Sequence, residues 1–413
     1  MNIWLISIFE QTPIDKVFST RFISIAEEAV KKGHRVTFFA STFKHNTKNQ
    51  RFEKTTSVQI NDQYELVFVK SSAYQKNISA KRLLSHYRYA KNILPEMNKR
   101  GKPDVILMAF PPVSLAYEVS KWAKDKSIPV VMDIIDPWPD LFKNALPSVL
   151  KPASDVLLYP LSYKLKKTLS NVTAVTAISE QYLAWAKTYF PQLANMHCYY
   201  PAVDLQATQE QIRIYKDKVN RNEKALTVIY AGSLASSYDI PGILDAAKIL
   251  SSKYDNIYFK IAGAGPQQTL IEEYMSNHSN LAYLGRLSKH ELMREYYLSD
   301  LGLTQHVKGA TQSVTYKLFD LLASGLPVLN SLESEMNDII VKNKVGLFNE
   351  PGNAAQLAEN IERFYLDREL LQKLKNNALD VVARLGDTKM VYKNFVEMLE
   401  RYATASENIV AEA

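Results

Sequence analysis

Several common signatures are missing from this chain of 413 residues. Its single cysteine, Cys198, excludes an intramolecular disulfide and is typical of proteins in a reducing compartment. No uninterrupted apolar run approaches about 18 residues, so the sequence predicts no transmembrane helix. Motifs of the HExxH, CxxC and nucleophile-elbow types are also missing, which leaves metalloprotease, zinc-site and serine-hydrolase functions without support.

The beginning of the chain lacks the features of a signal peptide. Residues 1–9 contain no basic n-region and no small-residue cleavage site, and the apolar run from Ile3 to Phe9 has the length of a strand. The net charge of +7 is mild for the length. It fits attraction to anionic membrane surfaces or phosphorylated substrates as well as to nucleic acid. We expect a cytoplasmic protein, soluble or peripheral on the inner face of the membrane.

What is present is ordinary globular material, with 46% hydrophobic and 23% charged residues. The length favours two domains. Short apolar runs alternate with helical periodicities from Ile3 to Ile178, and the alternation restarts at Leu226. The stretch between Gln206 and Lys224 is highly polar, and the link is expected near residues 201–206. The pattern predicts an α/β protein with two doubly wound parallel sheets that face a cleft.

Individual elements follow from the same periodicities. Strands are expected at 3–9, 36–40, 65–69, 103–110, 129–135, 172–178, 226–231, 257–262, 281–286 and 301–304. Helices are expected at 20–32, 81–100, 113–126, 241–250, 267–275, 291–298, 356–364, 368–379 and 390–402, with another capped by Ser179. Residues 44–61 are expected to form a loop, and residues 403–413 a loose tail. The helix at 81–100 is basic and amphipathic; it can lie on an anionic membrane or form a solvated surface helix, which we favour.

The stretch from Val314 to Leu329 carries the clearest candidate site. It predicts a loop, a helix, a stop at Gly325 and a buried strand. The unpaired amides at the start of such a helix suit a phosphate, and Lys317 adds a cation. One turn further, the carboxylate of Asp320 can accept both hydroxyls of a ribose. The alternative is an ordinary αβ unit of a doubly wound sheet.

Other candidates lie where a strand gives way to a helix. Gly232-Ser233 and Gly263-Ala-Gly265 are weak signals singly, since glycine is common at such turns. Together with Arg286, Lys317 and Asp320 they are expected to converge on one sheet edge and hold a diphosphate, a ribose and a base. Asp136 follows the buried strand 129–135, which makes it a second site candidate or a carboxylate that caps a turn. Asp133 is expected to turn into the fold.

Short motifs then point to one family. They are Lys32-Gly-His-Arg-Val36, Lys102-Pro-Asp-Val-Ile106, Asp133-Ile-Ile-Asp-Pro-Trp-Pro139, Ala177-Ile-Ser179, Tyr200-Pro-Ala-Val-Asp204, Val228-Ile-Tyr-Ala-Gly-Ser233, Ile261-Ala-Gly-Ala-Gly-Pro266, Leu284-Gly-Arg286 and Tyr316-Lys-Leu-Phe-Asp-Leu-Leu-Ala-Ser-Gly-Leu-Pro-Val328. The last is the most specific. Over nearly its whole length the chain resembles the GT-B fold glycosyltransferases of family 4, and most closely the branch that builds bacterial surface polysaccharides.

The resemblance implies a fold, a reaction and partners. Residues 1–203 form a Rossmann-like acceptor domain, residues 204–386 a Rossmann-like nucleotide-sugar domain, and residues 387–413 a C-terminal helix that packs back on the first domain. A sugar, most simply a hexose, passes with retention from a nucleoside-diphosphate sugar, with UDP favoured. The acceptor is lipid-linked or a glycan, and an anionic membrane surface is a further partner. No metal, cofactor or nucleic acid is implied.

The resemblance also assigns roles to residues. Lys317 and the backbone of Ser313, Val314 and Thr315 would steady the diphosphate, with Leu318 beside them. Catalysis would rest on Lys317 and Asp136, with Asp136 facing the acceptor and the transferred sugar. The remaining donor-binding positions are Gly232, Ser233, Gly265, Arg286 and Asp320. Of these, Asp320 would take the ribose, and Gly265 and Arg286 would flank the base.

Several positions depart from the family pattern. The family's E-x7-E pair is Gln312 and Asp320 here, and Ser236-Ser-Tyr-Asp239 stands where a cation usually follows the Gly232 loop. Ile135 replaces a histidine or arginine before Asp136, and Ala202 replaces an asparagine. These departures indicate a different diphosphate clamp or a loss of activity. A non-catalytic glycosyltransferase-like subunit is therefore the main alternative. A sugar-nucleotide epimerase ranks behind it, because no convincing acid–base pair is present.

Overall fold

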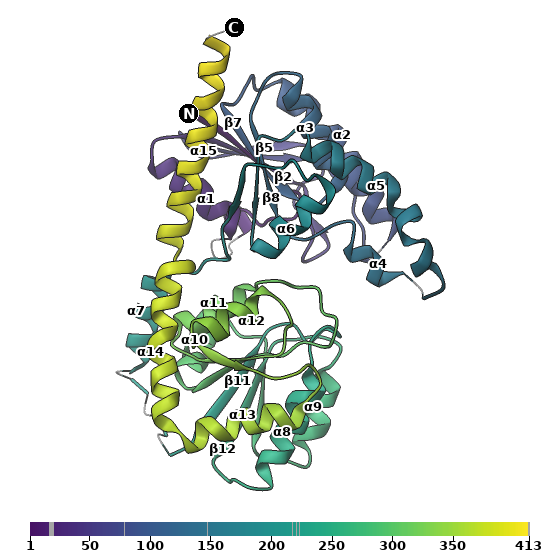
Figure 1. Cartoon of the computed structure of the whole chain (residues 1–413). Coiled ribbons are helices and arrows are strands. Elements are labelled where there is room, and N and C mark those ends of the chain that lie inside the picture. The colour runs from purple at the N-terminus through teal and green to yellow at the C-terminus, as the bar shows by residue number, and fades with distance from the viewer. Residues whose placement is uncertain are drawn as a thin grey trace. The chain divides into compact units, whose positions relative to one another are not determined.

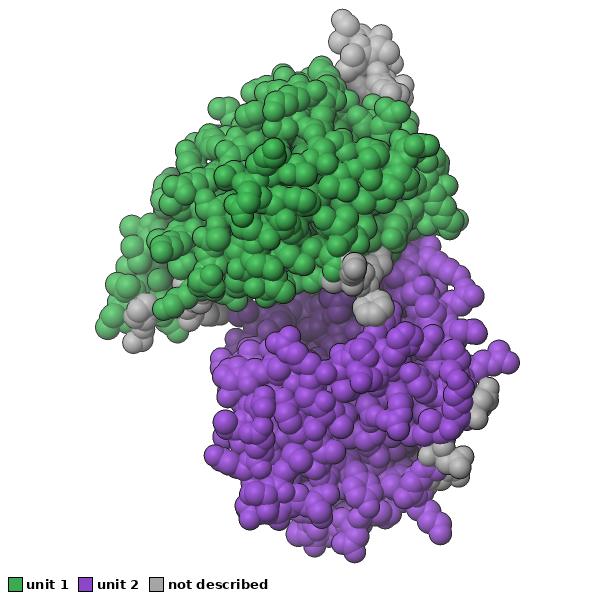
Figure 2. All heavy atoms as spheres, turned by 180° about the vertical axis from the view of Figure 1, so that it is seen from behind, with its two compact units in different colours: residues 1–199, 391–413 green, residues 200–390 purple. Residues whose placement is uncertain are grey.

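The computed structural model describes residues 1–15, 20–77, 79–146, 148–216, 218–219, 221–222 and 224–411. The chain divides into two compact units, shown in Figures 1 and 2. Unit 1 comprises residues 1–199 and 391–413, and unit 2 comprises residues 200–390. Each unit is a sheet with helices on its faces, so the fold is α/β with two parallel-sheet domains, as the sequence predicts. Among the described residues, no helix combines the length and apolar character needed to cross a bilayer.

The sheet of unit 1 has eight strands in the order β10-β9-β8-β7-β1-β2-β6-β5. All neighbours are parallel except β5, which pairs antiparallel with β6 at the edge. The strands are β1 (Asn2–Ile6), β2 (Arg35–Ser41), β5 (Thr56–Asn61), β6 (Tyr64–Val69), β7 (Val105–Phe110), β8 (Val130–Ile134), β9 (Ala174–Ala177) and β10 (Met196–Cys198). A separate hairpin joins β3 (Phe43–Lys44) to β4 (Asn49–Gln50). The strands β1, β7 and β8 are almost wholly buried, as expected of parallel strands covered by helices on both faces.

The helices of unit 1 follow the strands in alternation. They are η1 (Pro13–Asp15), α1 (Arg21–Lys31), α2 (Ala80–Asn98), α3 (Val113–Lys124), α4 (Leu141–Ala145), η2 (Ser148–Ala153), α5 (Ser154–Leu169) and α6 (Glu180–Tyr189). Ser179 caps α6 as predicted, since its side chain accepts from the Tyr182 amide. From Val391 the last helix, α15 (Thr388–Ala411), belongs to unit 1. There Phe395 packs on Tyr199, and Glu400 pairs with His34 at 2.7 Å.

The sheet of unit 2 has six parallel strands in the order β13-β12-β11-β14-β15-β16. The strands are β11 (Leu226–Ala231), β12 (Ile257–Ala262), β13 (Leu281–Gly285), β14 (Leu301–Thr304), β15 (Val328–Asn330) and β16 (Gly346–Phe348). The helices are α7 (Leu205–Lys216), α8 (Ile240–Ser251), α9 (Gln268–Met275), α10 (Lys289–Tyr297), α11 (Tyr316–Ala323), α12 (Glu335–Lys342), α13 (Ala354–Leu366) and α14 (Arg368–Leu385). From β11, the next two strands in the chain, β12 and β13, lie toward one edge of the sheet, and β14, β15 and β16 lie toward the other. The strand order therefore reverses between β11 and β14, which is where ligands bind in sheets of this kind.

Some sequence expectations were wrong. The loop expected at 44–61 contains the edge strand β5, whose exposed, polar side chains conceal its strand character. The short strands β10 and β16 and the helices α4, α5, α7 and α12 were not predicted. Only Thr208 is buried on α7, so that helix lacks the apolar stripe on which prediction depends. The tail expected to be loose continues α15 as far as Ala411, and residues 412–413 lie outside the described residues.

Candidate functional site

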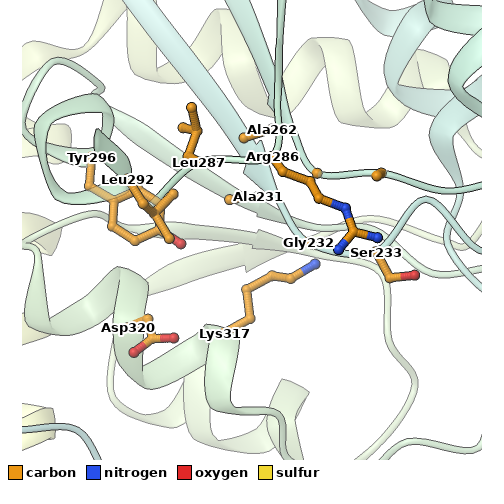
Figure 3. Close-up of a pocket in the computed structure, with 12 residues that line it drawn as sticks. Ala231, Gly232, Ser233, Ala262, Arg286, Leu287, Leu292, Tyr296, Lys317 and Asp320 are labelled. Carbon is orange, nitrogen blue, oxygen red and sulfur yellow. The ribbon is translucent and has the colours of Figure 1, made fainter. Parts of the chain in front are cut away.

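A cavity of about 590 Å³ opens in unit 2 at the reversal of strand order. It lies beyond the carboxyl ends of β11 and β12, beside the start of α11 (Figure 3). The cavity is lined by Ala231, Gly232, Ser233, Ala262, Gly263, Ala264, Arg286, Leu287, Leu292, Tyr296, Lys317 and Asp320. Five of the predicted donor residues, namely Gly232, Ser233, Arg286, Lys317 and Asp320, are therefore brought together.

Glycines let the strand ends pack closely at this edge. A Cβ on Gly263 would lie 1.8 Å from the carbonyl oxygen of Gly232, and a Cβ on Gly265 would lie 2.7 Å from the Leu234 carbonyl. A Cβ on Gly232 would lie 2.7 Å from the Nζ atom of Lys317. The Gly232 amide also donates to the carbonyl of Ala262 at 3.0 Å. The glycines therefore set the shape of the cavity wall, and Gly265 acts behind that wall.

Gly263→Ala should lower the free energy of unfolding of unit 2 by about 3 kcal/mol, because the new methyl group collides with backbone and φ is +137°. Gly352→Ala is the matched control, since its φ is +80° but nothing lies within 4 Å of its Cβ. That variant should cost about 1 kcal/mol. Urea unfolding followed by far-ultraviolet circular dichroism measures both losses. Equal losses in the two variants would contradict the close-packing argument.

The side-chain amine of Lys317 is buried and has no acidic partner among the described residues. Lys317 is the second residue of α11, and burial lowers its pKa to about 7. Its amine lies 4.0 Å from the ring centroid of Tyr230 and 4.7 Å from that of Tyr238. In the part of the chain that the structure describes, this amine has no hydrogen-bond partner. Such an ammonium is costly unless an anion binds to it, so the cavity is suited to a negatively charged ligand.

Two residues behind Lys317 were missed by the sequence analysis. Tyr238 lies in the segment that was noted only for lacking a cation, and its ring instead supports the Lys317 amine. The ring of His306 lies 5.0 Å from that of Tyr238. Burial and the nearby Lys317 lower the pKa of His306 to about 4, so its imidazole stays neutral. Neither contact has a sequence signal, because both depend on how separate loops meet.

Asp320 and Arg286 complete the charged lining. Burial raises the pKa of Asp320 to about 6, against a weaker opposing effect of Lys289. Arg286 is exposed, and it makes no ion pair with any residue that the structure describes. Figure 3 shows its guanidinium and the Lys317 amine both turned toward Gly232 and Ser233. The cavity thus presents two unpaired cations at one end and a carboxyl group further along α11.

The other predicted donor residues lie at the start of α11 but outside the cavity lining. The side chains of Val314 and Leu318 are buried in the apolar core, and the Leu318 amide donates to the Thr315 carbonyl. Ser313 is buried, and its carbonyl accepts from the Ser334 hydroxyl at 2.7 Å. Thr315 occupies the N-cap position of α11 without a capping bond from its side chain.

Asp136 belongs to unit 1, where it follows β8. Asp136 is exposed to solvent, but the protein atoms around its carboxyl group partly desolvate it and raise its pKa, and the nearby Arg82 guanidinium opposes that rise. Arg82 comes from α2 and lies 4.9 Å from the ring centroid of Trp138 and 5.1 Å from that of Phe9. Ile135, where the family carries a cation, packs against the apolar core instead. Arg82 therefore brings to Asp136 a positive charge that the neighbouring sequence lacks, and the sequence analysis had not singled it out.

Among the described residues, no cluster of three or more histidine, cysteine, aspartate or glutamate side chains is arranged to hold a metal ion.

Family models match both units. The model of glycosyl transferases group 1 matches residues 211–381, and the model of glycosyltransferase family 4 matches residues 19–207. No curated protein sequence matches the chain. Solved structures match at low identity, which bears on the fold alone. Sucrose-phosphate synthase from Thermosynechococcus elongatus has 14% identity and a TM-score of 0.74 over 98% of this chain and 99% of its own.

Two further structures share the architecture. WaaG, a glycosyltransferase involved in lipopolysaccharide biosynthesis, has 14% identity and a TM-score of 0.65 over 97% of this chain and 99% of its own. Anabaena HepE, solved in complex with UDP, has 12% identity and a TM-score of 0.67 over 97% of this chain and 100% of its own. The shared architecture is the GT-B fold, and the two family-model matches make the chain a glycosyltransferase. The two model matches place the chain in glycosyltransferase family 4.

Proposed function

We propose that this glycosyltransferase moves a hexose from UDP to a lipid-linked or glycan acceptor, with retention, in the synthesis of a surface polysaccharide. The observation that carries the donor assignment is the buried, unpartnered amine of Lys317 on the wall of the unit 2 cavity. A diphosphate supplies the anion that this amine lacks. HepE, of the same architecture, was solved with UDP, which supports that nucleotide among the alternatives.

The diphosphate is assigned to the space between Lys317, Arg286 and the start of α11. The helix dipole and the amides of its first turn favour negative charge there. Arg286 supplies the second cation that the segment after Gly232 lacks, rather than flanking the base. The carboxylate of Asp320, one turn along α11, accepts the ribose hydroxyls. Most catalysis comes from stabilising the charge that develops on the departing diphosphate, because the cations are already in place.

The acceptor is assigned to unit 1, with Asp136 as the residue that faces it. Arg82 restores a cation beside Asp136, so the family's pairing of charges is kept although Ile135 is apolar. The attacking hydroxyl of the acceptor needs a fixed side chain that orients it more than it needs a strong base. A carboxyl group held beside a guanidinium provides that orientation.

A thermal-shift panel of UDP, GDP, ADP and dTDP tests the donor assignment. At one hundred times its dissociation constant, UDP should raise the free energy of unfolding by about 2.7 kcal/mol. Asp320→Ala should lower the affinity for UDP more than the affinity for inorganic pyrophosphate, because only the nucleotide carries a ribose. The absence of any shift with all four nucleotides would contradict the proposal.

A non-catalytic subunit of the same fold is the second candidate. Gln312 stands where the family carries a glutamate, and its Oε1 atom is buried without a partner among the described residues. That reading predicts UDP binding without turnover of any sugar nucleotide, together with stable association with another transferase. Slow hydrolysis of a UDP-sugar by the purified chain, abolished by Lys317→Met, favours the enzyme.

A further inference from the structure

Two cations of unit 1 lie close together without acidic partners of their own. The guanidinium of Arg82, from α2, is partly buried, and Lys48 lies on the turn between β3 and β4. Both lie near the ring of Tyr74, at 6.0 Å from its centroid for Arg82 and 5.0 Å for Lys48. Neither cation forms an ion pair with any residue that the structure describes. Because like charges held this close repel each other, an anion bound to both would stabilise them.

The hydrogen bonds around Lys48 add a third donor. The Lys48 amine lies 3.2 Å from Nδ1 of His45 and donates to Oδ1 of Asn77 at 2.6 Å. An ammonium can only donate, so Nδ1 accepts and the other ring nitrogen, Nε2, carries the proton. In the part of the chain that the structure describes, no residue accepts from that N–H. Burial, Lys48 and Arg82 lower the pKa of His45 to about 4, so its ring is a neutral donor beside the two cations.

Polar atoms deeper in the same cluster also lack hydrogen bonds. His86 lies one turn after Arg82 on α2 and is 1% exposed, yet neither of its ring nitrogens has a partner among the described residues. The Nε atom of Arg82 is buried under the same condition. Buried polar groups in folded proteins nearly always have a partner, which can be protein, water or a ligand. A cluster with this many unused polar atoms is suited to a polar ligand.

The cluster lies beside the residue that we assign to the acceptor. The rings of Phe9 and Trp138 pack on the Arg82 guanidinium, and Trp138 lies two residues after Asp136. Burial lowers the pKa of Arg82, while Tyr74 and Asp136 oppose that effect. Asp136 is exposed and forms no ion pair with any described residue, so its single carboxylate does not neutralise two cations. Positive charge is therefore in excess where the acceptor is assigned.

We propose that Lys48, His45 and Arg82 bind a carboxylate or phosphate group carried by the acceptor sugar. The guanidinium fork matches two oxygens of either group, and the amine and the imidazole N–H match a further oxygen. The proposal rests on the proposed function in one respect, namely that the acceptor lies at Asp136. It adds the chemical class of the acceptor, which is a uronic acid or a sugar phosphate rather than a neutral sugar. Anion binding itself needs only unit 1.

Tryptophan fluorescence of the full chain tests the proposal, because all four tryptophans belong to unit 1 and Trp138 packs on Arg82. Glucuronate and glucose 6-phosphate should each change the fluorescence with a dissociation constant about tenfold lower than that of glucose. Arg82→Met and Lys48→Met should each remove this preference. Arg88→Met is the matched control, because Arg88 is an exposed arginine of the same helix that donates to the Ser72 hydroxyl at 3.1 Å instead. It should bind like the unchanged chain.

Two further measurements make the test specific. The preference should persist in Lys317→Met, which removes the buried amine of unit 2 and so excludes binding at the donor cavity. Urea unfolding shows whether each variant folds, and Lys48→Met, a change on a surface turn, decides the matter if Arg82→Met does not.

Three outcomes overturn the proposal. They are equal affinity for glucuronate and glucose, an unchanged preference in Lys48→Met, and tighter binding of inorganic phosphate than of either sugar acid, which would make the cluster a site for a free anion. UDP stabilisation is measured in parallel and reports on unit 2 alone. Preference for sugar acids without UDP stabilisation would contradict the proposed donor and leave the anion site in place, and UDP stabilisation without that preference would do the reverse.

Discussion

Asp133→Ala should lower the free energy of unfolding of unit 1 by about 3–5 kcal/mol, because it leaves a buried guanidinium without its counter-charge. Both side chains of the Arg21–Asp133 pair are fully buried. The two carboxylate oxygens accept from Arg21 at 2.7 and 2.9 Å, and one of them also accepts from the Thr176 hydroxyl at 2.7 Å. Arg21 in turn donates to the carbonyl of Tyr199 at 2.9 Å. The pair joins α1, β8 and β9, so its loss affects the whole unit.

Tryptophan fluorescence during urea unfolding isolates this effect, because all four tryptophans, Trp4, Trp122, Trp138 and Trp185, belong to unit 1. Replacing both partners, Arg21→Met with Asp133→Leu, should recover much of the loss, since neither member of the pair is then left buried without the other. Glu28→Ala is the surface control. It breaks a pair whose lysine side chain is 77% exposed, and should cost less than about 1 kcal/mol. A loss that small for Asp133→Ala would contradict the burial argument.

Most of the strands were predicted from the sequence, because buried parallel strands are apolar along their whole length and stand out as short apolar runs. The run Val105–Phe110 is uninterrupted and apolar, and the structure has a strand there. The structure also confirmed that Asp133 turns into the fold, where it pairs with Arg21. A buried carboxylate is costly without a cation beside it, so this pairing is expected. Elements that bury little, such as β5 and α7, carry no such pattern, so they were missed.

The site could be predicted only for residues that follow the strands of one parallel sheet, because such residues share one edge of that sheet. Gly232, Arg286 and Lys317 each follow a strand of one parallel sheet, so topology alone places them near one another. Side-chain contacts between separate loops could not be derived in that way. The ring of Tyr238 beneath Lys317 and the guanidinium of Arg82 beside Asp136 are of this kind. Both occur near positions where the family's usual cation is missing, so a departure from a motif can mark a place where the structure compensates.

Lys317→Met should lower donor turnover about 10²–10³-fold, the usual cost of removing one preorganised charge that stabilises a developing anion. The same change should stabilise the ligand-free protein, because methionine fills the space without burying a charge. Replacing a catalytic residue that destabilises the fold lowers activity and raises stability. Replacing a structural residue lowers stability and activity together. Thermal unfolding without ligand and initial rates of UDP-sugar hydrolysis measure the two.

The pKa of Lys317 adds a pH signature. Burial lowers the pKa in the folded state to about 7 from the ordinary lysine value of 10.5. The unfolded chain therefore binds more protons between these values, and the stability of the ligand-free protein should rise with pH across that window. A bound diphosphate favours the protonated amine. UDP affinity should thus be highest below pH about 7 and fall above it, by up to tenfold per unit.

Arg286→Met separates the role of this amine from that of charge in general. It removes a cation from the same cavity, but from an exposed side chain. UDP affinity should fall by about tenfold in this variant and keep its decline above pH 7. In Lys317→Met the decline should vanish, and any titration of the nucleotide itself appears in both proteins. Calorimetry in buffers of different ionisation enthalpy adds a direct count, because UDP binding at pH 8 should take up a proton in the unchanged chain and in Arg286→Met but not in Lys317→Met. Equal proton uptake in all three would assign the titration to another group and remove Lys317 from the diphosphate.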